Sequence, residues 1–148
     1  MDRIDREILR NLVKEARISN VELADRVGLS PSACLRRVQD LEQRGVIAGY
    51  HARLDPLALG KGFTAYVMVG LSHHTRQCQE SFELAVADAE QVTECHNITG
   101  SYEYILRVEA ADLQEYKRFH TEILAAIPGV SSIVSHVVMA SPKAVRPL

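Results

Sequence analysis

Residues 19–45 read SNVELADRVGLSPSACLRRVQDLEQRG, and this stretch decides the fold of the N-terminal part of the chain. It predicts two short helices separated by a very tight turn. A capping box at Ser19–Glu22 opens the first helix, because its hydroxyl and its carboxylate each satisfy a backbone N–H, and Gly28 ends it. Ser30-Pro31 then starts the second helix at once, since serine caps a helix and proline suits its first position. We expect this second helix to stop at Gly45.

A further helix is expected before them, over residues 2–16, where apolar side chains recur at helical spacing. Two short helices joined by so tight a turn form a helix-turn-helix, whose second helix can enter the major groove of DNA. Cys34, Val38 and Leu41 share one face of that second helix and should be buried. DNA binding is therefore assigned to the helix start and the remaining side chains, namely Ser30, Ser32, Ala33, Arg36, Arg37 and Gln43.

The chemistry of this helix suits a polyanion, and a second interpretation stays open beside it. Arginine contacts phosphate or forms two hydrogen bonds with guanine, and a serine near a helix start reaches phosphate or a base edge. Charge is also split along the chain: residues 1–62 carry 11 Lys or Arg and 9 Asp or Glu, whereas residues 63–148 carry 6 and 10. The alternative is that Arg36 and Arg37 only solvate a surface helix, with Asp40 weakening the positive field.

The remainder of the chain predicts a second domain. Residues 46–54 resemble a strand or short wing, and residues 57–62, with two glycines, resemble a hinge. Beyond the hinge the apolar patterns predict strand 64–71, helix 77–89, strand 92–99, strand 102–109, helix 112–127 and strand 130–139. This order is that of ferredoxin-like domains, in which two helices cover one face of an antiparallel sheet.

The other face of this sheet is expected to meet a second copy of the chain. Apolar residues lie on both sides of the predicted strands, among them Val67, Val69, Ile105, Val134 and Val137. Because a bare apolar face needs cover, we expect a twofold dimer. A dimer also suits a helix-turn-helix, since two copies read two half-sites of DNA.

Short motifs along nearly the full length match one family in the right order. They are IDREIL (4–9), RISNVELA (17–24), GLSPS (28–32), RV (37–38), LEQRGVI (41–47), GY (49–50), ITGSYEY (98–104) and PGV (128–130). Through them the chain resembles transcription regulators of the Lrp/AsnC (leucine-responsive regulatory protein, feast-famine) family. The resemblance implies an α+β fold, with an N-terminal winged helix-turn-helix joined by a linking strand to a ferredoxin-like βαββαβ domain.

The resemblance also implies partners and an arrangement of domains. We expect a helix-turn-helix DNA-binding domain over residues 1–50, a linker strand and hinge over 51–62, and a ferredoxin-like effector-binding and oligomerisation domain over 63–148. The partners would be double-stranded DNA, a free amino acid bound between subunits, and further copies of the chain in a homodimer, a tetramer or an octamer. The amino acid would change assembly or DNA affinity. Where the family often has acidic residues on both sides of the tyrosine of the turn, this chain has Ser101 and Glu103, so the effector itself is not transferred. Gln39-Asp40 stands where basic residues are frequent in the family, which bears on the strength of phosphate contacts.

The amino acid is expected near the turn that precedes Tyr104. Gly100 lets the backbone turn its N–H groups toward a carboxylate, and Glu103 can meet the ammonium. Ser135 and His136 lie on the last strand and, by alternation, point to opposite faces. The predicted effector residues are Gly100, Ser101, Tyr102, Glu103, Tyr104, Ser135 and His136. The alternative is a plain hairpin turn whose tyrosines belong to the core.

Other functions find little support in the sequence. His73-His74 with Cys78, or Cys95-His96, offer metal-binding atoms but no metal-ligand spacing, so we expect no metal site and no cofactor. We expect no enzyme, because none of the familiar catalytic motifs is present. Three cysteines, no signal peptide and no membrane span favour free thiols and a cytoplasmic protein. The competing function is an amino-acid-binding or oligomerisation module without specific DNA binding.

Overall fold

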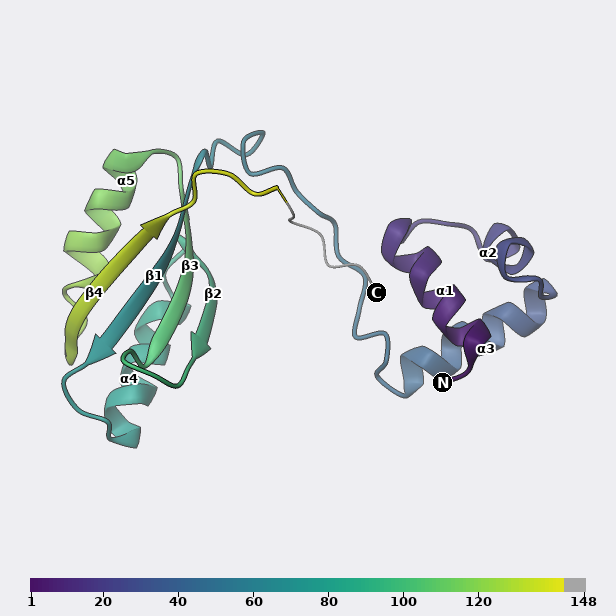
Figure 1. The fold of residues 1–148 in the computed structure, drawn as a ribbon, viewed down its shortest axis with the longest axis horizontal. Coiled ribbons are helices and arrows are strands. Elements are labelled where there is room, and N and C mark those ends of the chain that lie inside the picture. The colour runs from purple at the N-terminus through teal and green to yellow at the C-terminus, as the bar shows by residue number, and fades with distance from the viewer. Residues whose placement is uncertain (143–148) are drawn as a thin grey trace. The chain divides into compact units, whose positions relative to one another are not determined.

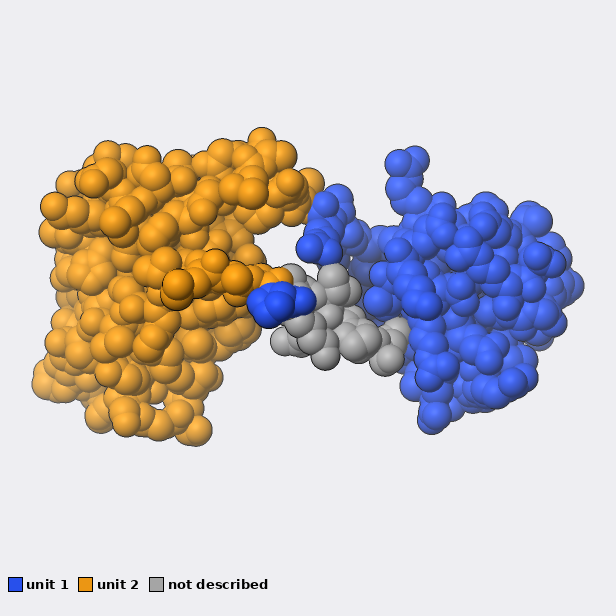
Figure 2. All heavy atoms as spheres, turned by 45° about the horizontal axis from the view of Figure 1, so that its top comes forward, with its two compact units in different colours: residues 1–53, 142–148 blue, residues 54–141 orange. Residues whose placement is uncertain are grey.

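Three helices fill the N-terminal part of the chain in the computed structural model, which describes residues 1–142. The chain divides into two compact units, residues 1–53 with Pro142 and residues 54–141 (Figure 2). Each unit has its own hydrophobic core. Residues 143–148, which belong to the second domain expected from the sequence, lie outside the described residues.

The first unit is the predicted helix-turn-helix with one helix before it. Its helices are α1 (Arg3–Lys14), α2 (Asn20–Val27) and α3 (Pro31–Gln43) (Figure 1). Gly28 ends α2 in the left-handed conformation, with φ of 68°, which favours glycine. The core of the unit is made by one face of each helix: Ile8, Leu9, Leu23, Ala24, Val27, Cys34 and Leu41 are its buried residues.

The helix starts follow the expected chemistry with one difference. The Ser19 and Ser30 side chains each accept a hydrogen bond from the backbone three residues on, which confirms them as N-caps. The capping box predicted at Ser19–Glu22 is only half formed. The Glu22 carboxylate forms an ion pair with Arg26 in place of a hydrogen bond with the Ser19 N–H. A complete capping box stands instead at the start of α1, where Asp2 and Asp5 bond to each other's backbone N–H.

The strand or wing expected over residues 46–54 is not formed in this structure, so that prediction is corrected. The backbone N–H groups of Val46 and Ile47 donate to the Leu41 carbonyl and complete the end of α3. Residues 48–55 have no regular secondary structure, and residues 56–60 form a turn. A strand requires a neighbouring strand to satisfy its ladder hydrogen bonds, and the described part of this single chain supplies none there.

The second unit has the predicted order of strands and helices (Figure 1). The four strands pair in the order β2-β3-β1-β4, and all the pairs are antiparallel. This is the ferredoxin-like arrangement expected from the sequence. The elements are β1 (Phe63–Leu71), α4 (Arg76–Ala87), β2 (Val92–Asn97), β3 (Tyr104–Ala110), α5 (Leu113–Arg118) with a π-helical continuation over Phe119–Leu124, and β4 (Val130–Val137).

Two elements differ in length from their predicted bounds. The hairpin strands stop at Asn97 and resume at Tyr104, so the turn is wider than the two residues expected, because Ile98 N–H bonds to the Glu103 carbonyl and closes a longer loop. The helix expected over residues 112–127 is α-helical only to Arg118 and then widens into the π-helix. Both differences arise from local hydrogen bonding that apolar periodicity does not encode.

One face of the sheet packs against α4 and α5. Val67, Val69 and Leu106 on the strands are fully buried, together with Phe82 on α4 and Phe119 after α5. Aromatic contacts extend this core, with the rings of Phe82 and Tyr104 4.6 Å apart. Strand alternation therefore places every second residue of β1 and β3 in this core.

The opposite face of the sheet is open in the single chain. Met68 lies in register with Ile105 on one side and Val134 on the other, and Tyr66 lies with Arg107 and His136. These two rows run across β4, β1 and β3 on the face away from the helices. Val137 was one of the residues expected to make both faces of the sheet apolar. It pairs with the buried Ala65, so it lies on the helix side of the sheet, on the edge strand β4.

We predict that Phe82→Ala lowers the free energy of unfolding by about 3–5 kcal/mol, because it leaves a cavity in the sheet-helix core. The measurement is urea unfolding followed by circular dichroism. Leu84→Ala on the same helix is the matched control, since Leu84 is 71% exposed and its removal creates no cavity. Equal losses for the two variants would contradict the assignment of Phe82 to the core.

Candidate functional site

The outward face of α3 is a narrow polar stripe. Ser32, Arg36, Gln39 and Gln43 recur at helical spacing on the side opposite to Cys34 and Leu41, and all four are exposed. Leu35 stands beside the stripe with 46% of its surface exposed. Such a face presents one cation, amide groups and an apolar side chain, which are the partners of guanine, adenine and the thymine methyl group.

The two adjacent arginines of α3 have different surroundings. The Arg37 guanidinium binds Asp2 at 2.8 Å and Asp5 at 2.7 Å, both at the start of α1. These hydrogen bonds raise the pKa of Arg37, and the Asp5 N–H together with Arg37 lowers the pKa of Asp2. Arg36 is exposed and is in no ion pair among residues 1–142. Arg37 therefore fastens α3 to α1, which is not the contact role expected for it, and Arg36 is available to a partner.

Asp40, which was expected to weaken the positive electrostatic field of α3, is in an ion pair. Asp40 pairs with Arg44 one turn further along at 2.8 Å, on the flank of the helix rather than on its outward stripe. At the other end, Ser30 accepts a hydrogen bond from Ala33 N–H, so its oxygen caps the helix. Asn20 on α2 donates to the Pro31 carbonyl at 2.8 Å and holds the turn between the two helices.

The six DNA-binding residues predicted from the sequence thus lie in three places. Ser30 and Ser32 are at the start of α3, Arg36 and Gln43 are on its outward stripe, and Ala33 and Arg37 are on the flank toward α1. Sequence reasoning missed Leu35 and Gln39, although the spacing from Ser32 places Gln39 on the same face.

The turn between β2 and β3 carries the predicted effector residues. Gly100 has φ of 127° and is exposed, and no atom lies within 4 Å of where a Cβ would be. Glu103 N–H donates to the Val69 carbonyl and Asn97 donates to the Glu103 carbonyl, so the base of the turn is tied to the sheet. Within the described residues, the N–H groups of residues 99–102 have no partner and are open to an acceptor.

The Glu103 carboxylate makes two polar contacts and is largely buried, although the sequence predicted it in an exposed turn. Its Oε2 accepts a hydrogen bond from Leu71 N–H at 2.6 Å, and its Oε1 lies 3.0 Å from His74 Nδ1. Only 15% of its side chain is exposed, whereas 75% of the His74 side chain is exposed. The carboxylate therefore joins the turn to the end of β1, and the exposed partner of the pair is His74.

The other predicted effector residues do not converge on this turn. Tyr104 is buried and its hydroxyl donates to Glu83 Oε1 at 2.7 Å, toward α4. Ser135 bonds to the Tyr116 hydroxyl on the helix side, and His136 lies on the open face, which agrees with the alternation expected for them. Gly100, Ser101, Tyr102 and Glu103 belong to one turn, whereas Tyr104, Ser135 and His136 lie outside it, and their assignment to one effector site stays a prediction.

No group of three or more His, Cys, Asp or Glu side chains comes close enough to hold a metal ion within the described part of the chain. No helix among residues 1–142 has the length and apolarity that crossing a membrane requires.

Together, a helix-turn-helix with an exposed recognition helix and a separate ferredoxin-like unit define a DNA-binding regulator with a sensor domain. Comparison with known proteins agrees in both halves. Residues 1–48 match the family described as "Winged helix-turn-helix DNA-binding", and residues 64–148 match the "Lrp/AsnC ligand binding domain". The chain belongs to the Lrp/AsnC family of transcription regulators.

Individual relatives cover almost the whole chain. The leucine-responsive regulatory proteins of Escherichia coli strain K12 and of Klebsiella pneumoniae are each 42% identical to it, over 97% of this chain and 87% of theirs. The transcriptional regulator NMB0573 of Neisseria meningitidis, solved in complex with L-Met, has a TM-score of 0.95 at 32% identity, covering 100% of this chain and 96% of that one. Escherichia coli AsnC has a TM-score of 0.89 at 25% identity, covering 97% and 95%.

We predict that Arg37→Ala lowers the melting temperature of the first unit at neutral pH, because Asp5, only 8% exposed, loses its cation. Arg44→Ala, which breaks an exposed pair on the same helix, should leave the melting temperature close to that of the unmodified protein. Thermal unfolding followed by circular dichroism separates the two outcomes.

The same network predicts a pH dependence. The pKa of the Asp2 carboxyl lies below its ordinary value of 3.8 in the folded chain. Its contribution to stability is therefore complete above pH 3.8 and is lost as the pH falls through the lower, folded value. The stability difference between the unmodified protein and Arg37→Ala should shrink as the solution is acidified below pH 3.8. A difference that stays constant down to pH 2 would show that Arg37 acts through packing alone.

Proposed function

We propose that this regulator binds specific sites on double-stranded DNA through α3 and that a free amino acid at the β2-β3 turn changes its assembly or its DNA affinity. The observation that supports DNA reading is the outward stripe of α3, where Arg36 is exposed between Ser32 and Gln39. Arg37 and Arg44 are both held by carboxylates within the unit, so Arg36 is the cation of this face that remains for DNA.

The working unit that we propose is a homodimer, with a tetramer or octamer as its larger assembly. Met68, Ile105 and Val134 form an apolar row on the open face of the sheet, which a second copy would cover. Two copies would present two recognition helices to two half-sites of DNA. We assign residues 1–50 to DNA binding, 51–62 to the linker and 63–148 to effector binding and assembly, in a cytoplasmic protein.

The effector that we propose is an amino acid whose two charged groups meet opposite sides of the turn. The free N–H groups of residues 99–102 suit a carboxylate, as in other backbone anion sites. The ammonium would take the place of His74 on Glu103 Oε1, while Oε2 keeps the Leu71 N–H. The L-Met complex of the Neisseria meningitidis relative supports an amino acid of this kind.

We predict that Arg36→Ala weakens binding to the specific duplex by about 10-fold or more, because it removes a guanine or phosphate contact. Fluorescence anisotropy with the duplex upstream of the protein's own gene and a scrambled duplex, at physiological salt, measures the change. Arg118→Ala, an exposed arginine of α5, is the matched control and should bind as the unmodified protein does.

An unchanged affinity of Arg36→Ala would reject the assignment of α3 as the recognition helix. If the unmodified protein also failed to prefer the specific duplex, with or without pooled amino acids, the function would be that of an amino-acid-binding or oligomerisation module. Size-exclusion chromatography of the same variants shows that their assembly is unaltered, so that a loss of binding reports on the contact.

We predict that Glu103→Gln lowers the affinity for L-methionine or L-leucine by roughly 10-fold, since hydrogen bonds between charged groups are stronger than neutral ones. The glutamine oxygen can still accept from Leu71 N–H, so the turn should keep its fold. Isothermal titration calorimetry gives the affinity, and Glu90→Gln, an exposed residue after α4, is the control. Undiminished binding by Glu103→Gln would place the ammonium elsewhere.

A further inference from the structure

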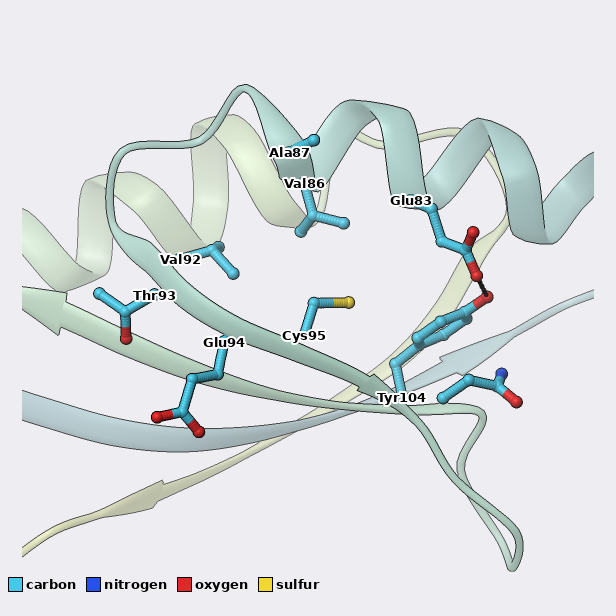
Figure 3. Close-up of a pocket in the computed structure, with 9 residues that line it drawn as sticks. Glu83, Val86, Ala87, Val92, Thr93, Glu94, Cys95 and Tyr104 are labelled. Carbon is cyan, nitrogen blue, oxygen red and sulfur yellow. Dashed lines mark hydrogen bonds between the residues drawn. The ribbon is translucent and has the colours of Figure 1, made fainter. Parts of the chain in front are cut away.

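A cavity that is open to solvent lies in the ferredoxin-like unit, between α4 and β2. Its volume is about 330 Å³, and it is lined from α4 by Glu83 and Val86 and from the sheet by Val92, Cys95 and Tyr104 (Figure 3). Val86 and Val92 form an apolar wall, and the Cys95 side chain rises from β2 into the space beneath α4. The volume suits a ligand no larger than an amino acid, since small-molecule pockets start near 300 Å³.

One carboxylate dominates the chemistry of this cavity. Glu83 Oε1 accepts a hydrogen bond from the Tyr104 hydroxyl at 2.7 Å, and Tyr104 is only 1% exposed, so the carboxylate is fixed at the rim. Its other oxygen has no partner among the residues that the structure describes. The Glu94 carboxylate is directed away from the cavity (Figure 3) and lies 3.6 Å from Arg107 Nη1.

The neighbouring groups do not neutralise Glu83. Among residues 1–142, no lysine, arginine or histidine lines the cavity. Burial and then the Glu83 carboxylate raise the pKa of the Tyr104 hydroxyl, and burial and then Glu83 raise the pKa of the Cys95 thiol. Both groups therefore stay neutral at pH 7, and the cavity keeps one uncompensated negative charge beside an apolar wall.

We propose that this cavity is a second ligand site, which binds a small primary ammonium compound with its ammonium on Glu83 and its aliphatic group against Val86 and Val92. The site is separate from the β2-β3 turn and does not depend on the effector proposed there. Because no cation among the described residues lines the cavity, a carboxylate on the ligand has no charged partner there. The ligand is therefore an aliphatic amine or the ammonium end of a free amino acid, and these two sources can be distinguished.

The test uses full-length protein and three ligands that share an isobutyl group: 3-methylbutylamine, which lacks the carboxylate, 4-methylpentanoate, which lacks the ammonium, and L-leucine, which has both. Isothermal titration calorimetry should show that the amine binds and that the acid without an ammonium does not bind at this site. Glu83→Gln keeps an oxygen to accept from Tyr104 but loses the charge, and it should lower amine affinity at least 10-fold. Glu90→Gln should leave the affinity unchanged.

The two sources give different results with leucine. If the amino acid is the ligand, Glu83→Gln weakens one of two leucine-binding events, and Glu103→Gln weakens the other. If an amine is the ligand, Glu83→Gln weakens amine binding at least 10-fold and leaves leucine binding unchanged. Absence of amine binding by the unmodified protein, or equal amine affinity in Glu83→Gln, would overturn the proposal, whatever happens at the turn.

A second measurement needs no variant. Iodoacetamide labelling followed by peptide mass spectrometry reports on Cys95, which lines the cavity, and on Cys78, which does not. Saturating amine should slow the labelling of Cys95 several-fold and leave Cys78 unaffected. Equal labelling of Cys95 with and without amine would also overturn the proposal.

Discussion

The α-helices and the two central strands β1 and β3 each bury one face, and the rest of the described structure depends on that constraint. In α3 the buried Cys34 and Leu41 set the rotation of the helix, so that Ser32, Arg36 and Gln43 point outward. In β1 the buried Val67 sets which face of the strand meets the helices, and alternation then places Tyr66 and Met68 on the open face of the sheet. The surfaces available for DNA and for a second copy are thus the complements of the two cores.

Ion pairs within each unit then decide which charged groups remain for a partner. Arg36 and Arg37 are neighbours in the chain and chemically identical, yet one is exposed and the other binds two carboxylates of α1. In the second unit, Glu103 holds a backbone N–H and a histidine, whereas Glu83 holds only a tyrosine hydroxyl. A carboxylate with an open oxygen beside apolar side chains attracts cations, and this difference separates the two candidate ligand sites.

The helix-turn-helix and the order of the second unit were predictable because they rest on local rules. Serine caps, Gly28 and the spacing of apolar residues all act over one or two helical turns. The predicted strand at residues 46–54 was wrong because strand formation needs a partner strand, which β-propensity does not supply. The sequence could not place the Tyr104 and Ser135 side chains relative to the turn, because alternation about a buried face directs both of them toward the helices in the single chain.

The sequence by itself indicated the class of protein through its resemblance to a family. It also predicted the two-part architecture, the helix-turn-helix and the approximate position of the β2-β3 turn, since these depend on contacts between residues near in the chain. Only the tertiary structure decided that Arg37 belongs to α1, that Glu103 is tied to Leu71, and that Glu83 and Tyr104 frame a cavity. These contacts join residues 21 to 35 positions apart. Their formation depends on how packed faces bring distant side chains together, which no local pattern records.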